Sequence, residues 1–142
     1  MKDQYEDVKE FMRAFGQKIP ETKTMLSRNE QLLRYSLCDE EVNELIDSTN
    51  LVSYLDAVID LLYVTLGAAA AAGISNEDLI KAWNEVHSSN MSKFWTNDDV
   101  KTVPPGFNIT KVCDNKNIVR DYNGKVCKPA GYKKADLTFI AK

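Results

Sequence analysis

The sequence has little of what disulfide frameworks and zinc sites require. It contains three cysteines, with no CxxC pair, and a single histidine in 142 residues. A disulfide framework uses cysteines in even numbers, and a structural zinc ion takes four Cys or His ligands. The sequence therefore predicts reduced thiols and disfavours a zinc enzyme.

A secretory signal and a charge-free membrane span are also lacking. The first ten residues, MKDQYEDVKE, hold no apolar segment, which a signal peptide requires. The most apolar stretch, 51–73, contains Asp56 and Asp60, and each acid would cost roughly 2.5–3.5 kcal/mol near the centre of a membrane helix. We expect a soluble, cytoplasmic protein with no membrane partner.

Positive charge is scarce in the first two thirds of the chain. Residues 1–96 carry 16 acidic and 9 basic side chains, whereas residues 97–142 carry 5 acidic and 9 basic ones. Binding to nucleic acid depends on Lys and Arg neutralising phosphates, so we do not expect a nucleic-acid partner. The same contrast suggests a domain over 1–96 and a basic tail over 97–142 that packs on it or on a neighbouring subunit.

Helical periodicity is the strongest pattern that is present. Apolar residues at helical spacing predict helices over 3–15, 21–47, 51–72 and 75–93, with a break in the second near residues 27–29. Beyond residue 97, the dipeptide Asn123-Gly124 lies between apolar flanks and predicts a small β-hairpin. We therefore predict an all-α fold with a four-helix core and a mostly irregular tail that carries the hairpin.

Two of the predicted helices carry acids on faces that should be apolar. Glu40, Glu41 and Glu44 fall on the same face of a helix as Leu33 and Leu37. A solvated acidic face is the ordinary explanation for such a triplet. The next helix makes that explanation less attractive, because it also carries acids.

Asp56 and Asp60 stand one turn apart within the most apolar helix. Unpaired ionised carboxylates in an apolar setting cost several kcal/mol each, and no cluster of Lys or Arg occupies matching positions. A cation from outside should balance them. Mg²⁺ suits oxygen ligands best and completes its shell with water and substrate phosphates, and Mn²⁺ is the substitute we expect.

Three segments resemble the all-α nucleotide pyrophosphohydrolase superfamily: EEVNEL at 40–45, LDAVIDLLYVTLG at 55–67 and EVHSSNMSKF at 85–94. Its members include MazG-like proteins, phosphoribosyl-ATP pyrophosphohydrolases and dimeric dUTPases. The tail YNGKVCKPAGYKKADL at 122–137 is similar to a compact MazG-like branch of bacteria and phages. The resemblance implies a homodimer or dimer of dimers, with sites built by more than one subunit.

The resemblance also implies roles for the acids. Hydrolysis would occur between the α and β phosphates and release pyrophosphate. Glu41, Glu44, Asp56 and Asp60 would hold Mg²⁺, and Glu40 would act as general base on the attacking water or as a further metal ligand. Asp56 departs from the superfamily pattern, in which a Glu stands three residues before the Asp, where this chain has Ala57.

Further residues resemble the superfamily's substrate contacts. Asn90 and Lys93 would meet phosphate or sugar, unless they only end a helix. The basic tail would close over the triphosphate, or else is merely solvated. Phe15 and Gln17 would meet the base, with a core position as the alternative for Phe15. The predicted substrate-binding residues are Phe15, Gln17, Asn90, Lys93, Lys125, Lys128 and Tyr132.

Three functions follow from these observations. The first is hydrolysis of a (deoxy)nucleoside triphosphate, with dUTP favoured by analogy alone. The second is hydrolysis of phosphoribosyl-ATP. The third is a helical oligomer that binds nucleotides without turning them over.

Overall fold

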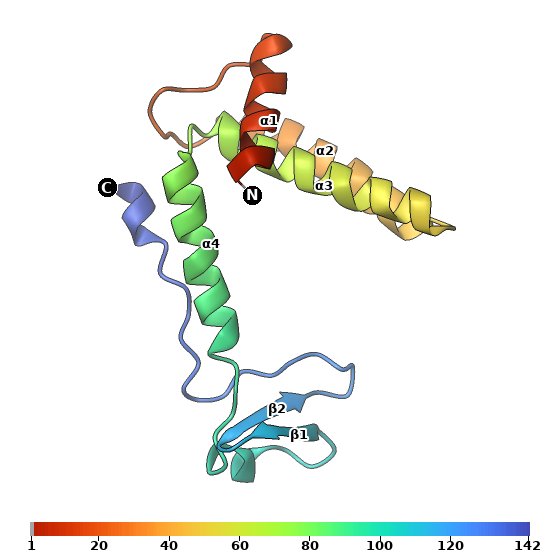
Figure 1. Ribbon diagram of the computed structural model, residues 1–142, viewed down its shortest axis with the longest axis vertical. Helices are drawn as coiled ribbons and strands as arrows, with labels where there is room; N and C mark the ends of the chain where they lie inside the picture. The colour runs from red at the N-terminus through yellow and green to blue at the C-terminus, as the bar shows by residue number, and fades with distance from the viewer. Residues whose placement is uncertain (1) are drawn as a thin grey trace. The chain divides into compact units, whose positions relative to one another are not determined.

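The computed structural model describes residues 2–142 and contains four main helices followed by a two-stranded hairpin (Figure 1). This confirms the predicted mostly helical fold. The chain divides into two compact units, one up to Ile80 and one from Lys81; the predicted boundary at 96/97 stays a prediction. The elements are α1 (Lys2–Ala14), α2 (Arg28–Asp47), α3 (Leu51–Ala71), α4 (Asn76–Met91), a 3₁₀ turn at Asp99–Thr102, β1 (Asn108–Cys113), β2 (Lys116–Arg120) and a 3₁₀ turn at Thr138–Ala141.

The second helix begins later than the periodicity indicates. α2 starts at Arg28, not near residue 21, because Ser27 and Glu30 form a capping box. The Glu30 carboxylate accepts hydrogen bonds from the Ser27 amide at 3.0 Å and from its hydroxyl at 2.8 Å, while the Ser27 hydroxyl accepts from the Glu30 amide at 3.3 Å. This cap stops the helix from extending backwards, so the expected break at 27–29 is its true start.

The core of the first unit lies between α1 and α3. Tyr5, Val8 and Met12 from α1 pack against Leu66 and Ala70 of α3, and all five are buried. α3 is rich in alanine at this end, which lets α1 approach closely. α2 and α3 run side by side as an antiparallel pair beyond this core (Figure 1).

Tyr5 supplies a pH-dependent contribution to this core. Its hydroxyl donates to the Ile74 carbonyl at 2.8 Å, and burial, together with the neighbouring Glu6 carboxylate, raises the pKa of Tyr5 from 10.0 to about 12. The folded state therefore favours the protonated phenol. The resulting stability is fully present below pH 10, the unfolded pKa, and is lost as the pH rises through the folded pKa of about 12.

We expect the urea midpoint of the protein to fall more steeply between pH 10 and 12 than that of Tyr5→Phe. At pH 7 the variant should be less stable by about 1 kcal/mol, since the Ile74 carbonyl loses its donor. Lysines also titrate in this pH range, but they affect the urea midpoints of both proteins equally, so the difference between the two curves reports Tyr5 alone. Parallel curves for the two proteins above pH 10 would contradict the prediction.

The hairpin of the second unit is displaced from its predicted position. β1 and β2 pair antiparallel around a tight turn at residues 114–115, where Asn115 has a φ of 56°. Asn tolerates this left-handed conformation. The predicted turn at Asn123-Gly124 also forms, but its flanks make only an isolated bridge between Arg120 and Val126. The expectation of a hairpin was right, and its location was wrong.

A large apolar surface remains exposed on the α2 and α3 pair. The expectation that the apolar helix over 51–72 is a buried central helix is wrong for its first half, since its buried residues are only Ala57, Leu66, Gly67, Ala70 and Ala71. Ile46 at the end of α2 and Val52 at the start of α3 are each 80% exposed. The other exposed apolar residues here are Leu32, Leu33, Tyr35, Val42, Leu51, Tyr54, Leu55, Val58, Ile59 and Leu62.

Candidate functional site

The five predicted carboxylates gather along the antiparallel pair of α2 and α3. Glu41 is their centre, because one of its oxygens, Oε2, is fully buried and has no hydrogen-bond partner. Burial raises the pKa of Glu41 above its ordinary value, and the charges of Glu44, Asp60, Glu40 and Asp56 raise that pKa further. All four other acids are therefore close enough to act on Glu41.

The burial of these acids is uneven. Glu41 and Asp60 are half-buried, whereas Glu40, Glu44 and Asp56 are exposed. The expectation that the whole acidic face is buried is therefore wrong for three of the five. The reason is that the apolar part of the same helices is itself uncovered within one chain, so the face has no lid of protein above it.

The carboxylates do not converge as a set of metal ligands. Within residues 2–142, no three Asp, Glu, His or Cys side chains lie close enough together to hold a metal ion. The orphaned oxygen of Glu41 nevertheless suits a cation, since a buried carboxylate oxygen requires a hydrogen-bond donor or a positive charge. The residues present thus fit a hard divalent cation with oxygen ligands.

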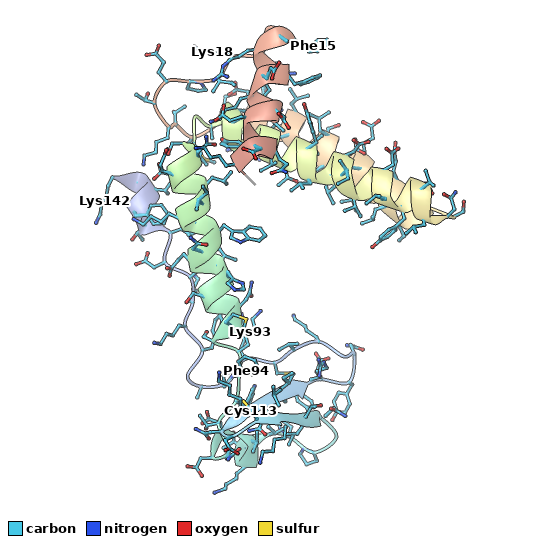
Figure 2. The ribbon with its side chains drawn as sticks, in the orientation of Figure 1. Phe15, Lys18, Lys93, Phe94, Cys113 and Lys142 are labelled. Atoms are coloured by element: carbon cyan, nitrogen blue, oxygen red, sulfur yellow. The ribbon has the colours of Figure 1, made fainter. Side chains whose placement is uncertain are left out.

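A group of polar and aromatic side chains lies near the start of α2 and the end of α3, away from the loop at residues 48–50 that joins these two helices. Arg34 of α2 donates from Nη2 to Gln17 Oε1 at 3.4 Å. Phe15 is 71% exposed and its ring lies 4.5 Å from that of Phe11, which makes an edge contact with Tyr63. Figure 2 shows Phe15 at the end of α1. A simple core role for Phe15 is therefore wrong within this chain.

Two more predicted contacts line a pocket in the second unit. Asn90 and Lys93, near the end of α4, border a pocket of about 150 Å³ that also touches Arg120 of β2. Lys93 donates to Asn90 at 2.8 Å, and Figure 2 shows Lys93 beside Phe94 where α4 gives way to the hairpin. The remaining wall of the pocket is apolar and consists of Met91, Phe94, Ile118 and Val126.

Tyr132 brings part of the basic tail back to α4. Its hydroxyl accepts a hydrogen bond from Ser89 at 2.9 Å, and Lys128 lies 4.6 Å from its ring. The Ser89 hydrogen bond lowers the pKa of Tyr132, as do the charges of Lys128, Lys93 and Lys134. The structure therefore groups Lys93, Lys128 and Tyr132. Lys125 lies in a separate turn, where its amide donates to Asp121.

Residues 8–90 match the protein family described as Phosphoribosyl-ATP pyrophosphohydrolase. The chain belongs to this family. The family is part of the all-α nucleoside triphosphate pyrophosphohydrolase superfamily, and its members are hydrolases that act on acid anhydrides. A search of curated proteins gave no significant match. The chain is therefore a nucleotide pyrophosphohydrolase, of a family that is generally Mg²⁺-dependent.

The family match decides how α3 should be understood. Among residues 2–142, α3 is the one helix long and apolar enough to cross a membrane. The phosphoribosyl-ATP pyrophosphohydrolase family is soluble, and α3 is a core helix of this chain. The apolar length of α3 is thus a feature of a soluble enzyme.

Sequence analysis missed two cations near the predicted residues. Arg34 stands seven residues before Glu41 and so lies on the same helix face two turns away. The seven-residue spacing from Glu41 is the sequence signal that identifies it. Arg120 could not be found in this way, because only the displaced strand pairing brings it to the pocket at Asn90 and Lys93.

Proposed function

We propose that the protein hydrolyses phosphoribosyl-ATP. Water attacks the α-phosphorus, the bond between that phosphorus and the α–β bridging oxygen breaks, and the products are phosphoribosyl-AMP and pyrophosphate. The family match supports this substrate, which sequence analysis placed second. The observation that carries the catalytic part is the orphaned, buried oxygen of Glu41 among four further carboxylates.

Glu41, Glu44, Asp56 and Asp60 are the residues that would hold Mg²⁺. When bound, the ion neutralises phosphate charge and lowers the pKa of a water molecule. Glu40, exposed on α2 beside this group, accepts the proton of the attacking water as general base. Its alternative role is that of a further ligand. Asp60 and Glu41 are the firmer ligands because they are the more buried acids.

Residues outside the acidic group would contact the rest of the substrate. Lys93, with Asn90 beside it, suits phosphate as a point charge. Lys128 and Tyr132 lie near Lys93, which supports a shared role on phosphate for all three. Phe15 offers an exposed ring on which a base can stack, and Lys125 is the least supported member of the predicted set.

A deoxynucleoside triphosphate such as dUTP is the second candidate substrate, and one observation favours it. The pocket at Asn90 and Lys93 has a volume of about 150 Å³ and a mostly apolar wall. A cavity of about this volume holds a single aromatic ring. That size suits a pyrimidine better than the two rings of a purine.

We also propose a homodimer, or a dimer of dimers, in the cytoplasm. The support is the apolar surface of α2 and α3, which is far more continuous than scattered exposed residues on a monomer. A second copy of the same surface is its simplest complement, because closed symmetric dimers are the commonest oligomers. The free thiols of Cys38, Cys113 and Cys127 agree with a reducing compartment.

A pyrophosphate-release screen distinguishes the two proposed substrates. We expect Mg²⁺-dependent release from phosphoribosyl-ATP, with a kcat/KM at least about tenfold above that for dUTP and for each of the eight common nucleoside triphosphates. That ratio corresponds to only about 1.4 kcal/mol of differential transition-state binding. Preference for dUTP would establish the second candidate instead. No release from any nucleotide with Mg²⁺ or Mn²⁺ would leave a nucleotide-binding oligomer.

A further inference from the structure

Arg34 on α2 is a half-buried cation whose natural partner is engaged elsewhere. A Glu four residues earlier on a helix is well placed to pair with an Arg, and Glu30 occupies that position. The Glu30 carboxylate instead accepts two hydrogen bonds from Ser27 in the helix cap. No carboxylate anywhere in residues 2–142 forms an ion pair with Arg34.

The donors of Arg34 are incompletely used. Nε is buried and has no hydrogen-bond partner within residues 2–142, and Nη2 makes one long bond of 3.4 Å to Gln17. A guanidinium has five N–H donors, accepts nothing and keeps its charge. Because an unsatisfied buried donor is costly, the group is suited to an acceptor supplied by a ligand.

The position of Arg34 relates it to the acids. Arg34 lies seven residues before Glu41 on α2, which is two helical turns or about 10 Å along the axis. On α3, Gly67 lies seven residues after Asp60, and a Cβ at Gly67 would lie 3.4 Å from Nη1 of Arg34. The guanidinium and the carboxylates thus occupy the same seam between the two helices.

We infer that Arg34, with Gln17 beside it, binds a phosphate monoester at the end of the substrate remote from the carboxylates. A planar fork of donors with a permanent charge matches phosphate oxygens in pairs. Phosphoribosyl-ATP carries such a group, the 5′-phosphate of its phosphoribosyl unit, and a simple nucleoside triphosphate does not. The assignment of this particular phosphate rests on the proposed substrate.

The first test compares two ligands, only one of which carries the 5′-phosphate of a phosphoribosyl unit. Arg34→Ala should raise the KM for phosphoribosyl-ATP about 10- to 100-fold, the loss expected for charged hydrogen bonds. The inhibition constant of ATP, which lacks that phosphate, should change by less than about threefold. Arg34→Lys keeps the charge without the fork and should fall between wild type and Arg34→Ala. Equal losses for both ligands would indicate a structural role and overturn the inference.

Arg28→Ala is the matched control for this test. Arg28 lies on the same helix and likewise donates to a glutamine, Gln31, at 3.5 Å, but it is exposed. It should leave both constants unchanged. A KM change as large as that of Arg34→Ala would show that general helix charge is responsible, and would overturn the inference.

The second test needs neither metal nor turnover. In EDTA, ribose 5-phosphate should shift the Nε–H resonance of Arg34 in a saturable ¹H–¹⁵N titration, whereas ribose should not. Absence of that shift would overturn the inference even if phosphoribosyl-ATP is a good substrate. A shift without any turnover of phosphoribosyl-ATP would retain the phosphate subsite and overturn the proposed function.

Discussion

Glu41→Gln is expected to abolish Mg²⁺-dependent pyrophosphate release and, at the same time, to raise the melting temperature of the metal-free protein. The two effects have one cause. A Glu41 carboxylate with a buried, unpartnered oxygen beside four acids is unfavourable in the empty protein. A neutral amide relieves the repulsion at pH 7.5 but is a poor ligand for a divalent cation.

The expected loss in kcat/KM is at least about a hundredfold, since metal-assisted charge stabilisation contributes several kcal/mol and 1.36 kcal/mol is tenfold in rate. The melting temperature in EDTA should rise by a few degrees, and added Mg²⁺ should stabilise the wild type but not the variant. Differential scanning fluorimetry with and without Mg²⁺ measures both.

Glu10→Gln is the control for Glu41→Gln, because Glu10 is an exposed acid of α1. It changes the net charge equally and should alter neither activity nor the response to Mg²⁺. Asp60→Ala should match Glu41→Gln in activity. The scheme is wrong if Glu41→Gln retains turnover, or if Asp60→Ala does.

Val52→Asp is expected to dissociate the proposed oligomer. Val52 is 80% exposed in the second position of α3, where an acid is favourable near the positive end of the helix. The free chain should therefore fold normally. In a dimer built on the α2 and α3 surface, the new carboxylate would be buried without a partner, at a cost of several kcal/mol.

This cost corresponds to a dissociation constant at least about a hundredfold higher. Sedimentation equilibrium should show a dimer or tetramer for the wild type and a smaller species for Val52→Asp at equal concentration. Turnover should fall with dissociation if a second subunit completes the site. Val112→Asp, at an exposed position of β1 in the second unit, is the control and should leave the mass unchanged. A monomeric wild type would refute the proposed interface.

The parts of the fold that the sequence predicted well depend on short-range interactions. Asn50 and Ser75 cap α3 and α4, and Gly73 ends α3 with a φ of 68°. Such features lie within a few residues of the helix ends that they determine.

The features that the sequence did not predict depend on what covers a surface. Periodicity placed Glu40 and Glu41 on one apolar face but could not show that this face lacks a cover within one chain. Both asparagine turns form, but only the turn at Asn115 joins two strands, whereas the turn at Asn123-Gly124 is flanked by a single isolated bridge. Arg34 was not predicted because a single basic residue forms no cluster. What singles it out is that the Glu30 carboxylate, its nearest partner along the helix, is already hydrogen-bonded to Ser27 in the cap.

The cap at the start of α2 therefore has a meaning beyond the helix it begins. The hydroxyl of Ser27 holds the Glu30 carboxylate in the helix cap, and an alanine at position 27 would free that carboxylate to pair with the Arg34 guanidinium one turn along. The alanine would then lower the stability of α2 and also, on our inference for Arg34, the affinity for the substrate phosphate. If Arg34 binds a substrate phosphate as we infer, selection for substrate binding acts on Ser27 as well.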